Sequence, residues 1–81
     1  MIVSVCFLGM QRQLTQTDQI QVPFLKKMRV ADIFNHIKEN YPELSLHEEM
    51  VLATVNKNVS SLEQRLQPDD EVSFIPHIGG G

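Results

Sequence analysis

The chain has 81 residues, enough for one domain and too few for a second hydrophobic core. Its 42% of hydrophobic residues suffices for a small core, while the net charge of −3 argues against binding to nucleic-acid phosphates. With a single cysteine and no apolar run near the roughly 20 residues that span a bilayer, the sequence predicts a cytoplasmic protein. We expect neither nucleic acid nor membrane as a partner.

The first predicted element is a strand over residues 2–8, which are rich in β-branched and aromatic side chains and end at Gly9. Side chains alternate between two faces along a strand, and both faces here are largely apolar: Val3, Val5 and Phe7 on one, Ile2, Cys6 and Leu8 on the other. This pattern is typical of a central strand.

A second strand is predicted around residues 20–24, after a polar link over residues 11–17. Ile20, Val22 and Phe24 alternate there with Gln21 and Pro23. Proline has no amide hydrogen for a sheet ladder, so this strand belongs near an edge of the sheet.

The hydrophobic spacing then changes to that of a helix. One apolar stripe runs along residues 30–40 and just beyond, made of Val30, Ile33, Phe34, Ile37 and Tyr41. Pro42 marks the end of the helix. Arg29 is a poor N-cap, so Asp32 is the candidate to accept hydrogen bonds from the free amides of the first turn.

Three short strands are predicted in the rest of the chain. They are residues 50–55, a short strand at Val59 after the turn at residues 56–58, and residues 71–75. Leu62 and Leu66 anchor the connector, and Pro68-Asp69-Asp70 form the turn before the last strand.

The order of elements is therefore ββαβββ, with one main helix. One helix covers only one face of such a sheet, so the fold class is an α+β roll with a mixed sheet. We expect the first and last strands to pair in parallel at the centre, because the helix lies between them in the chain.

The side chains offer little for catalysis. His36, His47 and His77 stand far apart without neighbouring cysteines, so no metal site is expected. Cys6 lies in an apparent central strand, where a thiol is more often an inert small hydrophobe than a nucleophile. The acidic residues at 69–71 suit a turn, and no glycine-rich phosphate loop follows a strand.

The chain end carries the strongest signal. Three of the four glycines are the last three residues, Gly79, Gly80 and Gly81. We expect a domain over residues 1–76 and a flexible tail over residues 77–81, whose five residues reach roughly 17 Å when extended. Glycine has no Cβ, so such a tail fits a channel too narrow for other residues. A frayed end without function is the alternative.

These features resemble the ubiquitin-like β-grasp sulfur carriers. The resemblance rests on the element order, Arg12 after the first strand, Val30-x-Asp32 at the helix start, the Asn56 turn, Leu66 followed by Asp70-Glu71-Val72, and the ending from Pro76 to Gly80-Gly81. The sequence resembles the MoaD-like small subunits of molybdopterin synthase most, and it resembles the ThiS carriers of thiamine synthesis next.

The resemblance implies a mechanism. An E1-like adenylating enzyme uses ATP to activate the carboxylate of Gly81, and a sulfur donor displaces AMP to leave a thiocarboxylate. The tail, with Gly79 and Gly80 in the narrow channel, then enters the large subunit of molybdopterin synthase, where its sulfur builds the dithiolene of molybdopterin. The chain itself would be a non-catalytic carrier that binds no cofactor, with the catalytic side chains in its partners.

A docking surface for these two partners is expected on the sheet face that the helix leaves open. Phe7, Val59 and Ile75 are the apolar residues that we expect there. Loops that cover the same side chains are the alternative.

The sequence departs from the family at a few positions. His77 stands where the family often has a second proline, Gly79 where a small non-glycine residue is common, and Pro68 where the last turn often has aspartate. Two other functions remain open. One is a thiamine-type sulfur carrier or a ubiquitin-like protein modifier, and the other is a β-grasp interaction domain without terminal chemistry.

Overall fold

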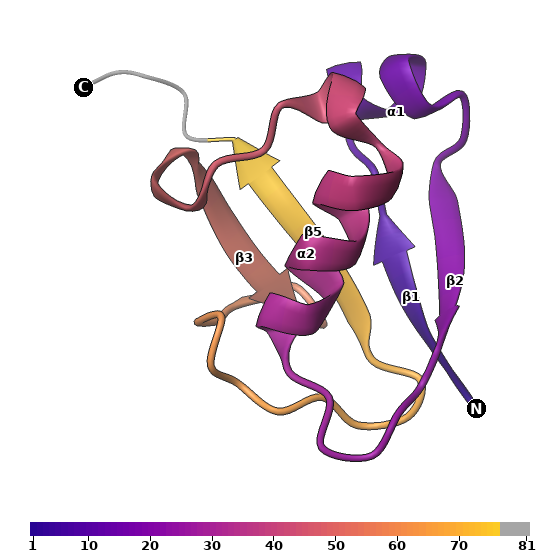
Figure 1. The fold of residues 1–81 in the computed structure, drawn as a ribbon, viewed down its shortest axis with the longest axis vertical. Coiled ribbons are helices and arrows are strands. Elements are labelled where there is room, and N and C mark those ends of the chain that lie inside the picture. The colour runs from indigo at the N-terminus through magenta and orange to yellow at the C-terminus, as the bar shows by residue number, and fades with distance from the viewer. Residues whose placement is uncertain (77–81) are drawn as a thin grey trace.

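The computed structural model describes residues 1–76, which form a five-stranded mixed sheet with one long helix across one face (Figure 1). The strands are β1 (Ile2–Cys6), β2 (Gln19–Pro23), β3 (Val51–Val55), β4 (Asn58–Val59) and β5 (Glu71–Pro76). The helices are α1 (Met10–Thr15) and α2 (Val30–Asn40), and two 3-10 turns follow at Pro42–Leu44 and Glu48–Met50.

The strand order is β2-β1-β5-β3-β4. Strands β1 and β5 pair in parallel at the centre, while the other neighbours are antiparallel. The predicted α+β roll, the central parallel pair and the edge position of the proline-containing strand are therefore confirmed.

Helix α2 has the predicted bounds and buries the predicted stripe, with Val30, Ile33, Phe34 and Ile37 all 2% exposed or less. These side chains pack in one core with Val3 and Val5 of β1 and with Val72 and Phe74 of β5. The rings of Phe34 and Phe74 meet edge to face with centroids 5.3 Å apart, a favourable aromatic geometry. The core thus ties the helix to the two central strands.

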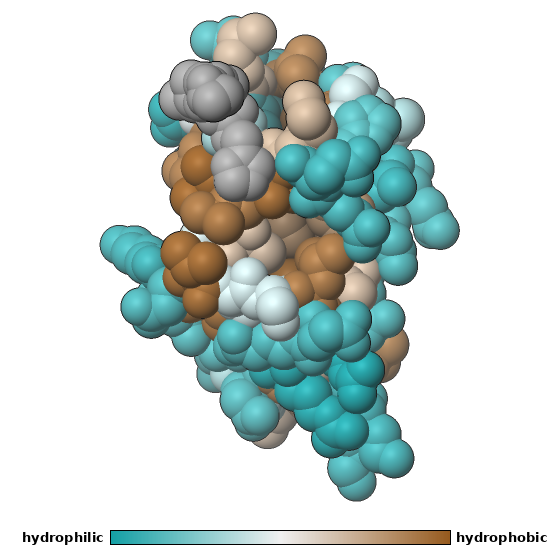
Figure 2. All heavy atoms as spheres, turned by 90° about the vertical axis from the view of Figure 1, so that its left-hand side faces the viewer, coloured by the Kyte–Doolittle hydropathy of each residue, from teal (hydrophilic) through white to brown (hydrophobic). Residues whose placement is uncertain are grey.

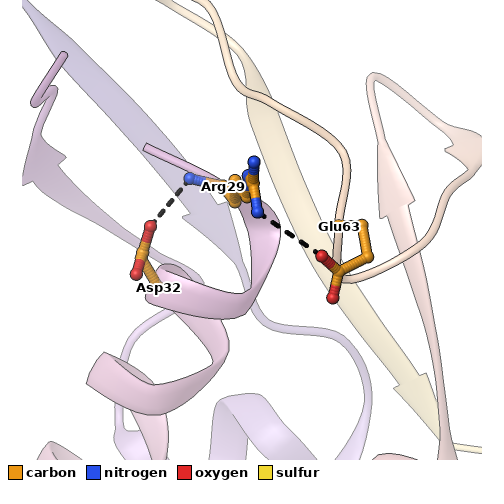
Figure 3. A network of polar contacts seen from close by, with 3 residues as sticks. All are labelled: Arg29, Asp32 and Glu63. Carbon is orange, nitrogen blue, oxygen red and sulfur yellow. Dashed lines mark hydrogen bonds and ion pairs between the residues drawn. The ribbon is translucent and has the colours of Figure 1, made fainter. Parts of the chain in front are cut away.

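The helix begins without a conventional cap. The Asp32 carboxylate accepts the Arg29 amide hydrogen at 2.8 Å, and the amides of Val30 and Ala31 donate to the carbonyls of Gln64 and Leu62. Figure 3 shows the bond between Asp32 and Arg29 together with the ion pair between Arg29 and Glu63. The ion pair has an N···O distance of 3.5 Å and is exposed, so it contributes little. Asp32 has the predicted role, and the connector after β4 supplies the other acceptors.

Two predictions about the start of the chain are wrong. The first strand ends at Cys6 rather than Leu8, and the predicted polar link contains helix α1. Gly9 has φ 54°, a left-handed value that glycine adopts without steric cost, and it turns the chain out of the strand. A helix of six residues is too short to show a full apolar stripe, so its sequence looks like a loop.

No helix in the described part of the chain is both long and apolar enough to cross a membrane.

Candidate functional site

The predicted reactive residues lie beyond the last described one. Gly79, Gly80 and Gly81 fall outside residues 1–76, and the division into a domain and a tail stays a prediction. The structure does define the base of the tail, because β5 ends at Pro76, opposite Val51 at the start of β3. Gly81 is therefore separated by five residues of chain from this corner of the sheet.

The sheet face opposite α2 carries an apolar area, which we call the open face. Strand register places Leu52 opposite Ile75, Thr54 opposite Ser73 and Val59 opposite Thr54, so all five share this face. Val59 is 68% exposed and Ile75 37%, as the prediction of a docking surface requires. Figure 2 views the molecule from the side of β3 and shows hydrophobic side chains gathered between hydrophilic ones.

Phe7 is not part of the open face, and its predicted place there is wrong. It is only 3% exposed and meets the ring of Tyr41 edge to face, with centroids 5.5 Å apart. The reason is strand alternation, which places Phe7 on the same side as Val3 and Val5, under the helix. Leu52, which the sequence did not single out, lies on the open face beside Ile75.

A second apolar feature adjoins the base of the tail. A shallow groove of about 240 Å³ lies between α1 and the segment before β3, and Pro76 forms part of its wall. The methionines at its rim are well exposed, Met10 by 70% and Met50 by 57%. Methionine adapts its shape to different neighbours, so this rim suits contact with another surface.

Cys6 is half-buried on β1 and has no features of a nucleophile. Burial, and next the negative charge of Glu71, raise the pKa of the Cys6 thiol above its ordinary value. The thiol is therefore protonated at neutral pH, whereas a reactive cysteine is a thiolate. This agrees with the structural interpretation of Cys6.

The acidic residues before β5 belong to a turn. Asn56 donates through Nδ2 to Asp70 Oδ1 at 2.9 Å, and its Oδ1 accepts the Glu71 amide hydrogen at 3.0 Å. Asp70 Oδ2 accepts the Gln67 amide hydrogen at 2.7 Å. Both side chains thus bind main-chain groups or each other. Within residues 1–76, no three His, Cys, Asp or Glu side chains gather closely enough to hold a metal ion.

Three polar residues are buried within residues 1–76, Gln11, Thr54 and Ser73, and the sequence singled out none of them. Gln11 of α1 is 7% exposed and its Nε2 donates to the Phe74 carbonyl of β5 at 2.7 Å. Nothing in the sequence distinguishes it from Gln13 and Gln16, which are exposed in the same segment.

Comparison with known proteins identifies the family. The family model described as "ThiS family" matches residues 5–81, nearly the whole chain. The chain belongs to the ThiS family. This carrier is also 30% identical over 80 residues to the molybdopterin synthase sulfur carrier subunit of Mycobacterium tuberculosis, with 98% of this chain and 96% of that protein covered.

Solved structures agree on the fold. A Pyrococcus furiosus protein described as molybdopterin converting factor, subunit 1, superimposes with a TM-score of 0.80 at 24% identity, covering 93% of this chain and 95% of that one. A chain from the complex of subunits 1 and 2 of the Helicobacter pylori molybdopterin-converting factor has a TM-score of 0.69 at 17% identity, with both chains fully covered. The predicted ubiquitin-like β-grasp fold and the family resemblance are confirmed, and the chain is a sulfur carrier of the MoaD/ThiS type.

Proposed function

We propose that this carrier is the small subunit of a molybdopterin synthase and that it carries sulfur as a thiocarboxylate at Gly81. The observation that supports this most is the 30% identity to a molybdopterin synthase sulfur carrier subunit over 98% of the chain. The match to the ThiS family model extends to residue 81, so it includes the three glycines that end the chain.

The proposed chemistry takes place in two steps. The Gly81 carboxylate attacks the α-phosphorus of ATP in an adenylating enzyme, and pyrophosphate leaves. A sulfur donor at the sulfide level then attacks the acyl carbonyl, and AMP leaves with the C–O electron pair, so that the terminal group becomes a thiocarboxylate. ATP is consumed by the partner, and this chain provides the acyl group and no acid, base or metal.

The described residues support a role in presenting the tail. Strand β5 is paired with β1 as far as Val72 and with β3 as far as Pro76, so the predicted tail begins at the end of a central strand of the sheet. The open face, with Val59, Ile75 and Leu52, is the surface we assign to docking by the adenylating enzyme and by a synthase large subunit. The complex formed by the Helicobacter pylori protein of the same fold gives this partner a precedent.

Intact-mass measurement tests the proposal. Incubation with the adenylating enzyme, ATP and sulfide should add the mass difference between sulfur and oxygen, and the loaded chain should then support molybdopterin formation by the large subunit. Absence of any mass change refutes the sulfur chemistry. Loaded protein that serves only a thiazole synthase, or that forms isopeptide bonds to lysines, refutes the assignment to molybdopterin synthase.

The docking surface has its own test. Val59→Asp places a charge on the open face at a side chain that is 68% exposed, so the fold should survive. Binding to the large subunit should weaken about 10-fold or more, because a desolvated charge without a partner is costly. Lys57→Asp, at an exposed position of the adjacent turn, is the control. Equal binding of both variants and wild type would exclude the open face as the docking surface.

A further inference from the structure

The pairing between the central strands β1 and β5 is continued by a side chain at its end. Register pairs Ser4 with Glu71 and Val5 with Val72, and the Ser4 amide donates to the Asp70 carbonyl at 2.9 Å. Donors to the same neighbouring strand recur every second residue, so steps of two from this bond lead to Leu8 and Phe74. The Leu8 amide and the Phe74 carbonyl are therefore the groups that a further rung would join.

The side chain of Gln11 takes the place of that direct bond. The Leu8 amide donates to Gln11 Oε1 at 3.3 Å, and Gln11 Nε2 donates to the Phe74 carbonyl at 2.7 Å. A carboxamide has the donor and acceptor of a peptide group, so it links the segment just after β1 to β5 beyond their last direct pair. The bond between Gln11 and Phe74 is buried and joins residues 63 positions apart in the chain, whereas the bond between Leu8 and Gln11 is half-buried and local.

The bridge holds β5 close to the base of the tail. Phe74 precedes Pro76 by two residues, and in residues 1–76 the direct register between β1 and β5 ends at Val72. On its other side, β5 stays paired with β3 as far as Pro76. On the side of β1, the Gln11 amide is thus the link nearest to the point where the tail leaves.

We propose that Gln11 is a positioning residue for sulfur loading, because it fixes the end of β5 and so the orientation of Pro76, the last described residue before Gly81. This inference rests on the proposed function of Gly81. Once a partner holds the open face, the place that Gly81 reaches depends on the orientation of Pro76. A tilt of about 15° there moves the far end of a fully extended tail by roughly 4 Å. Misplacement of reacting groups by even about 1 Å costs large factors in rate.

The test separates orientation from docking by comparing two kinetic constants. Gln11→Met keeps the length of the side chain and removes both hydrogen bonds, while Gln13→Met makes the same change at an exposed position of the same helix. Sulfur loading by the adenylating enzyme is followed by intact mass at increasing carrier concentration, at a temperature at which circular dichroism shows each variant folded. We expect Gln11→Met to lower kcat about 10-fold with KM changed less than about 2-fold, and Gln13→Met to match wild type.

Each outcome decides the inference. A Gln11→Met variant that melts earlier yet keeps the kcat and KM of wild type when folded has lost only stability, and this overturns the positioning role. If Gln11→Met does not fold, Gln11→Asn is measured in the same way. Asparagine keeps the amide but is one methylene too short to reach both partners. A lower kcat again supports the positioning role, and an unchanged kcat overturns it. Failure of wild type itself to load would instead refute the proposed function.

Discussion

Each end of β5 is held by the side-chain amide of one residue, Asn56 at the turn end and Gln11 at the tail end. Asn56 is exposed and binds Asp70 and Glu71 at the turn that opens the strand. Gln11 is buried and joins Phe74 to Leu8 across the sheet. A side-chain amide thus closes a turn at one end of β5 and replaces a main-chain hydrogen bond at the other end. Of the two residues, only Gln11 lies next to the predicted tail.

The largest effect is expected at the tail end, from deletion of Gly81. The new terminal carboxylate sits one residue short, about 3.5 Å from the position that the adenylating enzyme requires. Sulfur loading, followed by intact mass, should be abolished. Thermal unfolding should stay unchanged, because the core lies within residues 1–76. A deletion variant that loads as well as wild type would contradict the carrier chemistry.

Truncation of a buried core side chain should destabilise both ends of β5, because it destabilises the whole domain. Ile37 is fully buried under the two central strands, and Ile37→Ala should lower the free energy of unfolding by about 2–5 kcal/mol. Urea unfolding measures this loss. The control is Val59→Ala, at a side chain 68% exposed, which should cost far less. Equal effects of the two substitutions would mean that α2 does not cover the core as described.

A matched pair of substitutions compares the two ends directly. Gln11→Met leaves the Leu8 amide and the Phe74 carbonyl without their partner inside the protein, at a cost of about 1–3 kcal/mol. Asn56→Gly removes the same side-chain bonds and accepts the left-handed backbone at φ 50° without steric cost. Water replaces the lost bonds of its exposed turn partners, so the cost should stay near or below about 1 kcal/mol. Urea unfolding of both variants measures the difference. A larger loss for Asn56→Gly would reverse the comparison.

The two ends also differ in how far the sequence predicts them. Asn56, Asp69 and Asp70 are typical turn residues, and the side-chain bonds of Asn56 reach partners only 14 and 15 positions away, so composition alone indicated the turn. The Gln11 bridge spans 63 positions, and only the three-dimensional course of β5 reveals it. Helix α2 was predicted with its bounds because its stripe extends over three turns, whereas α1 is too short to show one.

The residues of the open face also differ in how far the sequence predicts their position. Alternation with Phe74 predicted Ile75 on the open face, and Val59, expected there as an apolar residue of a short strand, is placed there by its pairing with Thr54. Phe7 was assigned to that face against its own alternation with Val3 and Val5, and the structure buries it. Leu52 was missed because which face of β3 meets the helix depends on its pairing with β5. Local patterns thus place side chains within an element, and pairing between distant elements decides which face they join.

The smallest effect is expected at the turn end, where Glu71 opens β5 beside Cys6. Burial is the main cause that raises the pKa of the Cys6 thiol, and the Glu71 carboxylate is the second. A raised pKa lowers the thiolate fraction at a given pH, so Cys6 should react with iodoacetamide more slowly than free cysteine at pH 8. Glu71→Gln removes the second cause and leaves burial, so the pKa should fall part of the way and alkylation should accelerate a few-fold. Cys6 is the one cysteine of the chain, which makes total alkylation a direct measure.

Two controls accompany this measurement. Asp18→Asn removes a weaker cause of the same sign and should accelerate alkylation less than Glu71→Gln does. Glu49→Gln, at an exposed position that is not among the causes of the shift, should have no effect. Because Glu71 also donates its amide to Asn56, unfolding of Glu71→Gln is followed in parallel, to exclude acceleration by local opening of the turn. An alkylation rate unchanged in Glu71→Gln would show that the Glu71 carboxylate does not suppress the thiolate, and that the turn end contributes no charge effect to β1.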